Sequence, residues 1–180
     1  TLAPELRLDL LLDAIGRLPG SPLLVVMGDG PQAARLEGAP SERVRWLGPR
    51  PHAEAIDLLR AADVCVNVRD GDLGMKALEY AAVGRRFVAF RVEGGERLDG
   101  LYPGHRAAFL VDARSADALA RALEDALREE ARAPLPPAAI EAARAEVGWE
   151  RTARRIAAIL DEAATRGARG RGRGDRGAAS

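Results

Sequence analysis

Short apolar runs alternate along the chain with stretches in which apolar residues recur every three or four positions. The stretch from Leu6 to Leu18 has the second pattern and stops at Pro19-Gly20, which predicts a helix. The run Leu23–Met27 is continuously apolar and is closed by Gly28-Asp29-Gly30-Pro31, as expected for a buried strand of a parallel sheet. Both patterns recur up to residue 164, with strands expected over 44–47, 64–68, 87–90 and 108–111 and helices over 32–36, 53–61, 75–83, 115–130, 138–146 and 150–164.

Strands that alternate with helices through short links predict an α/β fold, a Rossmann-like parallel sheet with helices on both faces. Ligands of such sheets bind beyond the carboxyl ends of the strands. In this sequence those ends are residues 28–30, 47–50, 69–74 and 91–96. We therefore expect the functional residues in these four segments.

Length and composition fit one globular domain over residues 1–165, followed by a short tail. The tail, residues 166–180, is rich in Arg and Gly, has no apolar spacing and is predicted to be disordered. The whole chain has 27 Lys+Arg and 27 Asp+Glu. Five Arg and one Asp give the tail a charge of +4, so the remainder carries −4. An acidic body argues against a nucleic-acid partner, and the tail leaves a weak RNA-binding role and an anionic-membrane contact as alternatives.

The residues present in the sequence also exclude several other kinds of site and segment. A single cysteine, Cys65, excludes an internal disulfide framework and a zinc site with several thiolates. His52 and His105 are the only histidines and lie 53 positions apart, so no metal ion is expected. No apolar run approaches the roughly 20 residues of a membrane span, and no secretory signal pattern is present. These features favour the reducing cytoplasm.

The segment 71–90 is the most informative one for function. Asp72-Leu73-Gly74 leads from an expected strand end into a helix, so the N–H groups of Gly74, Met75 and Lys76 would face the ligand crevice and favour a phosphate. Glu79 follows one turn later and could accept hydrogen bonds from a ribose diol. The alternative is an ordinary solvated pair of Lys76 and Glu79 on the helix surface.

Residues 73–84, LGMKALEYAAVG, followed by Phe87-Val88-Ala89, resemble the donor-binding signature of retaining glycosyltransferases with the GT-B fold, the glycosyltransferase group 1 or family 4-like proteins. The resemblance extends over about residues 2–161 and includes the segments 24–31, 44–48, 56–64, 112–123 and 148–153. It implies the C-terminal, donor-binding half of a GT-B enzyme. Such an enzyme transfers a sugar from a nucleotide-diphosphate sugar, without metal or other cofactor, to an acceptor held by an N-terminal domain.

The resemblance also assigns roles to residues. Glu79 would hold the ribose, and Gly74, Met75 and Lys76 the phosphates. Gly28 and Gly30 would form the floor of the crevice. Gly48, Arg50 and Val83 would lie near the base and its ribose, and Asp72 would lie near the donor sugar. No catalytic residue is expected in this half, so the chain alone should be inactive. The N-terminal half would be supplied in cis or in trans, and peripheral contact with the inner face of the membrane is possible.

Three site positions depart from the family pattern. The Arg and Lys that clamp the diphosphate in the family fall on Thr1 and Leu6, with Arg7 one position late. The acidic residue near the donor sugar falls on Gly71, where Asp70 or Asp72 could substitute. These departures keep an alternative open, a catalytically degenerate nucleotide-sugar-binding or interaction module.

Overall fold

The chain forms two compact units, Thr1–Ala143 and Arg144–Ser180, in a computed structural model. The structure describes residues 2–37, 39, 42–71, 74–92, 98, 102, 105–128, 135–148, 153–154 and 156–159. Thr1, Asp72, the glycine-containing stretch 93–97 and the Arg/Gly tail lie outside the described residues. The predicted domain boundary at residue 165 therefore stays a prediction.

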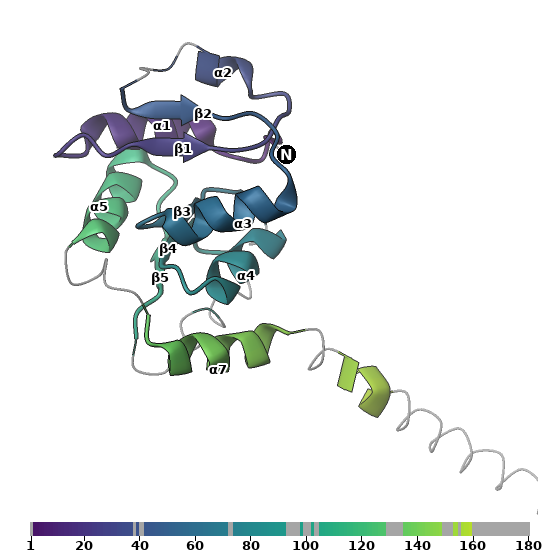
Figure 1. The fold of residues 1–180 in the computed structure, drawn as a ribbon. Helices are drawn as coiled ribbons and strands as arrows, with labels where there is room; N and C mark the ends of the chain where they lie inside the picture. The colour runs from purple at the N-terminus through teal and green to yellow at the C-terminus, as the bar shows by residue number, and fades with distance from the viewer. Residues whose placement is uncertain are drawn as a thin grey trace, which may run out of the picture. The chain divides into compact units, whose positions relative to one another are not determined.

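Helices and strands alternate through the first unit, as the sequence pattern predicts (Figure 1). In chain order they are α1 (Leu8–Arg17), β1 (Leu24–Val26), α2 (Ala34–Glu37), β2 (Val44–Trp46), α3 (His52–Ala61), β3 (Cys65–Asn67), α4 (Gly74–Ala82), β4 (Phe87–Phe90), β5 (Ala108–Val111) and α5 (Ala116–Leu127). Helix α7 (Pro137–Val147) begins in the first unit and ends in the second. In the second unit, residues 153–154 and 156–159 are also helical.

All strand pairs within the two sheets are parallel, which confirms the predicted α/β class. β1 pairs with β2, with Leu24 opposite Val44. β3, β4 and β5 form a separate sheet in that order. The expected single sheet is thus present as two separately hydrogen-bonded parts, and the stretch 2–7 spans their carboxyl ends.

The core lies between the sheets and the pair α1 and α5. Helix α1 buries Leu8 and Leu11, α5 buries Leu119 and Leu123, and these residues belong to one apolar cluster with strand residues such as Phe90. All four residues of β4 are buried, as expected for the middle strand of its sheet. This packing fixes the strand ends at which the candidate site lies.

Local signals account for the helix boundaries. The Ser115 hydroxyl accepts a hydrogen bond of 3.3 Å from the N–H of Ala118, so α5 begins where its predicted N-cap stands. Helix α1 begins at Leu8 rather than Leu6, because Leu6 forms an antiparallel bridge with Arg69. A tertiary contact therefore overrides the apolar spacing at this end.

Candidate functional site

The loop after β1 is fastened to the end of β2. The N–H of Gly28 donates to the carbonyl of Gly48 at 2.8 Å, and the indole N–H of Trp46 donates to the carbonyl of Gly28 at 2.9 Å. A Cβ at Gly30 would lie 2.8 Å from the carbonyl oxygen of Leu2, so no larger residue fits there. The structure thus brings the predicted residues Gly28, Gly30 and Gly48 together.

The N-terminal stretch 2–7 crosses from this loop to the end of β3. Leu2 donates its N–H to Asp29, and Arg7 donates its N–H to Val68, both at 2.8 Å. The Gln32 amide donates to the carbonyls of Ala3 and Leu6, which holds the stretch in place. Leu6 packs against the apolar core, so the position that resembles the family's Lys offers no cation.

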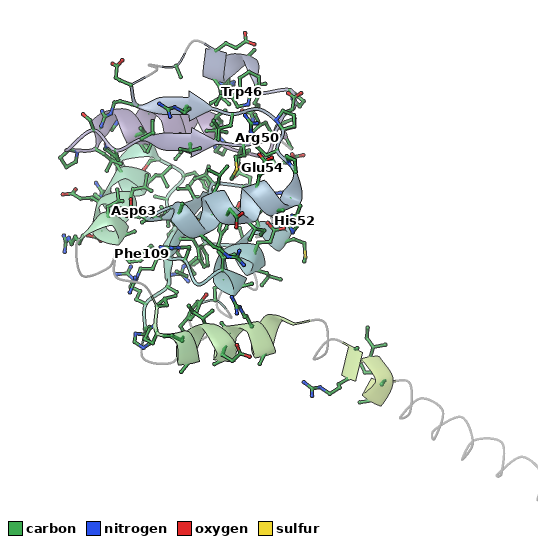
Figure 2. All side chains as sticks on the ribbon, viewed as in Figure 1. Trp46, Arg50, His52, Glu54, Asp63 and Phe109 are labelled. Carbon is green, nitrogen blue, oxygen red and sulfur yellow. The ribbon has the colours of Figure 1, made fainter. Side chains whose placement is uncertain are left out.

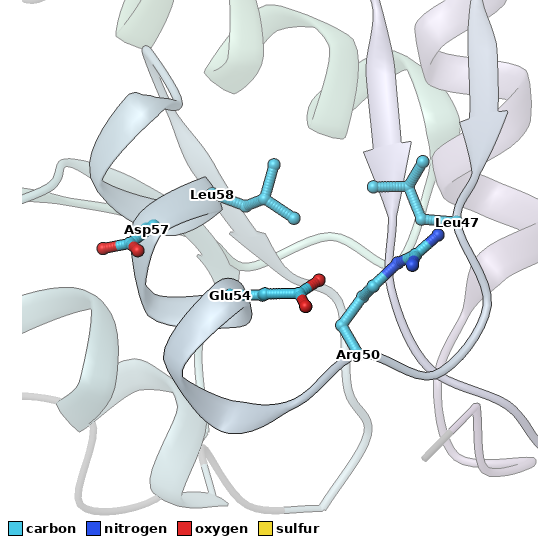
Figure 3. A pocket seen from close by; sticks show the side chains of 5 residues that line it. All are labelled: Leu47, Arg50, Glu54, Asp57 and Leu58. Carbon is cyan, nitrogen blue, oxygen red and sulfur yellow. The ribbon is translucent and has the colours of Figure 1, made fainter.

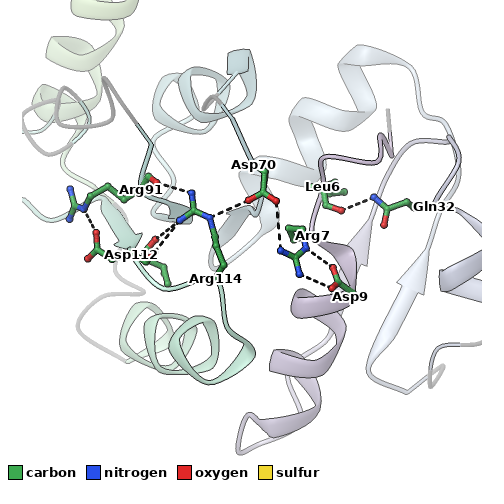
Figure 4. A network of polar contacts seen from close by, with 9 residues as sticks. Leu6, Arg7, Asp9, Gln32, Asp70, Arg91, Asp112 and Arg114 are labelled. Atoms are coloured by element: carbon green, nitrogen blue, oxygen red, sulfur yellow. Dashed lines mark hydrogen bonds and ion pairs between the residues drawn. The ribbon is translucent and has the colours of Figure 1, made fainter.

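Arg7 is the cation of this stretch, and two carboxylates engage it (Figure 4). Its guanidinium lies 2.9 Å from Asp9 and 3.7 Å from Asp70. The hydrogen bonds to Asp9 raise the pKa of Arg7, and those from Arg7 lower the pKa of Asp9. Asp70 also accepts from Arg114 at 3.1 Å and so lies between two arginines.

Arg114 joins the ends of the three strands of the larger sheet. Besides Asp70, it donates to the carbonyls of Arg91 at 2.9 Å and Asp112 at 3.2 Å, and its guanidinium carbon lies 4.5 Å from the centre of the Phe90 ring. These strand ends were predicted from the sequence, but the network of Arg114 was not. Charged residues directly after β3, β4 and β5 are the signal that could have predicted it.

Helix α4 presents its amino end at the edge of its sheet. Met75 is 63% exposed, and the ammonium of Lys76 lies 2.6 Å from the Glu79 carboxylate. The structure therefore contains the ion pair that was the alternative interpretation of these residues, and a ribose would have to compete for Glu79. Val83 follows the opposite end of α4, about 13 Å from Gly74 at 1.5 Å per residue, so the structure does not bring it to the amino end.

Two tyrosines fix α4. The Tyr80 hydroxyl donates to the carbonyl of Val66 at 3.1 Å, and the Tyr102 hydroxyl donates to the carbonyl of Ala81 at 2.5 Å. Burial raises the pKa of Tyr80, so this phenol stays protonated and remains a donor. The position of Glu79 along the sheet edge is therefore well defined by its neighbours.

A pocket of about 440 Å³ lies between the end of β2 and α3 (Figure 3). Its lining combines apolar and charged side chains: the Glu54 carboxylate points toward the aliphatic part of Arg50, and the Arg50 guanidinium points toward Leu47. Figure 2 labels the same two residues, Arg50 in the link between β2 and α3 and Glu54 on α3. The lining residues are Leu47, Arg50, Glu54, Asp57 and Leu58. The predicted Arg50 thus lines an open pocket, whereas Lys76 and Glu79 are not part of its lining.

The described part of the chain offers neither a metal-binding cluster nor a membrane-spanning helix. It contains no group of three or more His, Cys, Asp or Glu side chains able to hold a metal ion. Nor does any helix in it have the length and apolarity to cross a bilayer.

Comparison with known proteins agrees with this geometry. Residues 1–129 match the family model described as "Glycosyl transferases group 1". The chain belongs to this family. The sequence resemblance is thereby confirmed at the level of the family, and the fold at the level of its α/β architecture.

Curated relatives include enzymes named D-inositol 3-phosphate glycosyltransferase. The one from Corynebacterium urealyticum is 31% identical over 85% of this chain and 38% of its own length. The one from Corynebacterium glutamicum is 35% identical over 68% of this chain and 29% of its own length. The chain thus spans well under half the length of these relatives.

Solved structures share the fold. The chain matches Anabaena HepE, crystallised with UDP and glucose, with a TM-score of 0.70 at 19% identity, over 89% of this chain and 46% of that one. It matches sucrose-phosphate synthase from Thermosynechococcus elongatus with a TM-score of 0.69 at 26% identity, over 91% of this chain and 44% of that one.

Proposed function

We propose that this chain is the donor-binding half of a glycosyltransferase that uses a nucleotide-diphosphate sugar. The observation that carries the proposal is that the stretch 2–7 joins the Gly28 loop after β1 to the end of β3 through hydrogen bonds. Carboxyl ends of parallel strands are where ligands of such folds bind. Family membership and the HepE structure with UDP support a nucleotide as that ligand.

In this proposal each part of the donor meets a different element. The diphosphate lies at the amino end of α4, where the N–H groups of Gly74, Met75 and Lys76 favour negative charge. The Glu79 carboxylate leaves Lys76 and accepts from the ribose hydroxyls. The base enters the pocket between Leu47 and Leu58, and Arg50 and Glu54 offer polar contacts to its edge.

Charge compensation in this proposal comes from the protein, without a metal ion. Two cations at the strand ends are Arg7 and Arg114, and both contact Asp70. Acceptor binding and catalytic side chains belong to an N-terminal half, in cis or in trans. The cytoplasmic location, the membrane contact and the role of Asp72 stay predictions from the sequence.

A degenerate module is the second candidate, and one observation favours it. Leu6 packs against the core and Arg7 is paired with Asp9 and Asp70, so the N-terminal stretch holds no uncommitted cation among its described residues. A diphosphate would have to displace a carboxylate to reach Arg7. This candidate predicts nucleotide binding without sugar transfer when an N-terminal half is supplied.

Calorimetric titration with UDP, GDP and ADP tests the proposal. A half-site is expected to bind near millimolar, about −4 kcal/mol, with a preference for one base. Glu79→Gln should weaken that binding about tenfold, the loss of a charge-assisted hydrogen bond. The matched control is Glu124→Gln, an exposed glutamate on α5.

Lys76→Gln separates the two roles of Glu79. If Glu79 only pairs with Lys76, the Lys76 and Glu79 variants behave alike. If Glu79 holds the ribose, Lys76→Gln leaves the hydroxyl contacts intact and weakens binding much less. Failure of the folded chain to bind any of the three nucleotides at millimolar concentration contradicts the proposal.

A further inference from the structure

The carboxylate of Asp70 lies between two arginines that come from distant parts of the chain (Figure 4). Its Oδ1 accepts a hydrogen bond of 3.1 Å from the Nε–H of Arg114, and its Oδ2 lies 3.7 Å from Nη1 of Arg7. Each oxygen thus faces a different guanidinium. A phosphate group that binds two arginines would direct its oxygens in the same way, so the two cations form a place for one anionic group.

Arg7 is held in its position without Asp70. Its Nε and Nη2 donate to the two oxygens of Asp9 at 3.1 and 2.9 Å, and this double contact fixes the plane of the guanidinium. Its backbone N–H donates to the carbonyl of Val68 at 2.8 Å, which ties it to the end of β3. Nη1, which faces Asp70, takes no part in these contacts. Departure of the Asp70 carboxylate would therefore uncover one side of Arg7 without releasing the residue.

Arg114 also has contacts that do not depend on Asp70. Its guanidinium donates to the carbonyls of Arg91 at 2.9 Å and Asp112 at 3.2 Å, and its central carbon lies 4.5 Å from the centre of the Phe90 ring. These contacts use Nη1, Nη2 and the flat face of the group, whereas Nε donates to Asp70. Both cations would thus remain at the strand ends if the Asp70 carboxylate turned away.

The Asp70 side chain is the replaceable member of the three. It is 42% exposed, and its 3.7 Å separation from Arg7 is well beyond the roughly 2.7–2.9 Å of a strong charge-assisted hydrogen bond. Its backbone N–H donates to the carbonyl of Glu5 at 2.9 Å, so the main chain is fixed while the side chain can turn. Exposed ion pairs contribute little to stability, so an anion with more charge can displace this carboxylate.

We propose that Asp70 competes with the phosphates of the ligand for Arg7 and Arg114, and that the bound ligand takes the place of its carboxylate. The identity of the ligand as a nucleoside diphosphate rests on the proposed function, whereas the competition itself requires only a phosphate anion. A carboxylate beside the phosphates would also repel them. Asp70 therefore lowers the affinity of the site. A direct contact of Asp70 with the donor, the role left open by the sequence, predicts the opposite effect of removing its charge.

The test compares the folded 180-residue chain with its Asp70→Asn variant. Dissociation constants for inorganic pyrophosphate, UDP and uridine are measured by ¹H–¹⁵N NMR titration at one pH and one ionic strength. Asp13→Asn is the matched control, because Asp13 pairs with Arg17 and its loss changes the net charge by the same amount. The Nε–H signal of Arg114 serves as a second readout, since this group donates to Asp70.

Asp70→Asn should bind pyrophosphate and UDP about fivefold more tightly than the unchanged chain, beyond any gain in Asp13→Asn, while uridine binding stays the same. In the unchanged chain, millimolar pyrophosphate should shift the Arg114 Nε–H signal, a result that needs no variant. Weaker binding by Asp70→Asn overturns the proposal, because Asp70 would then contact the ligand. A gain no larger than that of Asp13→Asn, or an Arg114 signal that pyrophosphate does not move, overturns it as well.

The two proposals fail in different experiments. If Asp70→Asn tightens pyrophosphate binding but UDP binds no better than pyrophosphate, the competition is supported and the nucleotide site is contradicted. If UDP binds with a base preference but its affinity is the same in Asp70→Asn, the competition is overturned and the nucleotide site is supported.

Discussion

Trp46 and Gly28 are joined by a hydrogen bond of 2.9 Å, in which the indole N–H donates to the glycine carbonyl. The bond links the last residue of β2 to the loop after β1. Together with the Gly28–Gly48 bond it fixes the loop that borders the proposed donor site. A tryptophan at the end of a strand therefore positions a backbone turn across the sheet.

Trp46→Phe should lower the free energy of unfolding by about 1 kcal/mol, because the half-buried carbonyl of Gly28 loses its donor while most of the ring packing remains. The same change should weaken nucleotide binding by loosening the Gly28 loop. Urea unfolding and UDP titration measure the two effects. Arg45→Lys, an exposed change on the same strand, should alter neither; equal behaviour of the two variants would refute the role given to Trp46.

Gly84→Ala should destabilise the protein by more than Gly20→Ala. Both glycines have φ near +70°, so both pay the cost of a left-handed residue, about 1–2 kcal/mol. Only at Gly84 would the new Cβ overlap a side chain, that of Ile140 on α7, whereas Gly20 has open space. Thermal unfolding of both variants measures the difference.

The additional variant Ile140→Ala checks whether overlap with the Ile140 side chain causes the larger loss at Gly84. Combined with Gly84→Ala it should recover part of the loss, since the overlapping atoms are removed. Strictly additive losses would mean that the contact between the turn after α4 and α7 is not the source of the strain.

The buried thiol of Cys65 makes the protein less stable as the pH rises in the alkaline range. Burial, opposed by nearby Arg85, raises the pKa of its thiol from 9.0 to about 12. The unfolded chain therefore loses this proton first, and the free energy of unfolding falls by about 1.4 kcal/mol per pH unit as pH rises from 9 toward 12. Below pH 9 this group contributes no pH dependence.

Cys65→Ala should reduce the slope of stability against pH by about 1 kcal/mol per pH unit between pH 9 and 10, where denaturant unfolding measures it. Tyr80→Phe serves as the control, because the raised pKa of this phenol affects stability only above its ordinary value of 10.0. An unaltered slope in Cys65→Ala would show that the thiol is accessible to water in the native protein.

Arg114→Gln should cost about 1–3 kcal/mol of stability, because it removes donors from strand-end carbonyls and a cation above Phe90. Arg17→Gln is the matched control. Arg17 also pairs with two aspartates, Asp13 and Asp117, but in an exposed position, where ion pairs contribute about 0–1 kcal/mol. Urea unfolding should rank Arg114 well above Arg17, and the reverse order would contradict the network described at the strand ends.

The sequence predicts the element order because apolar periodicity reports burial directly. The run Phe87–Phe90 and the Ser115 cap are examples, since each depends on neighbours along the chain. The split of the sheet was not predictable in this way. It depends on which strand edges meet, and apolar runs carry no information on their lateral partners.

The sequence predicts where the candidate site lies, but only some of the contacts within it. Arg50 lines a pocket and Gly28, Gly30 and Gly48 lie together, because residues that follow parallel strands share one edge. The pairing of Asp70 with Arg7 and Arg114 joins residues far apart in sequence, and no local pattern indicates it. The Lys76–Glu79 pair, by contrast, follows from a spacing of three on a helix.

The central claim is that a nucleoside diphosphate binds at the carboxyl ends of β1, β2 and β3. Titration of the ¹⁵N-labelled chain with UDP, followed by ¹H–¹⁵N NMR, tests it most directly. The account predicts saturable shifts of the Gly28, Gly48, Arg50 and Glu79 amides, with Leu119 on the far helix α5 unaffected. Shifts confined to the groove between β5 and α5 near Arg106 and Arg121, or a folded chain without saturable shifts at millimolar UDP, would contradict it.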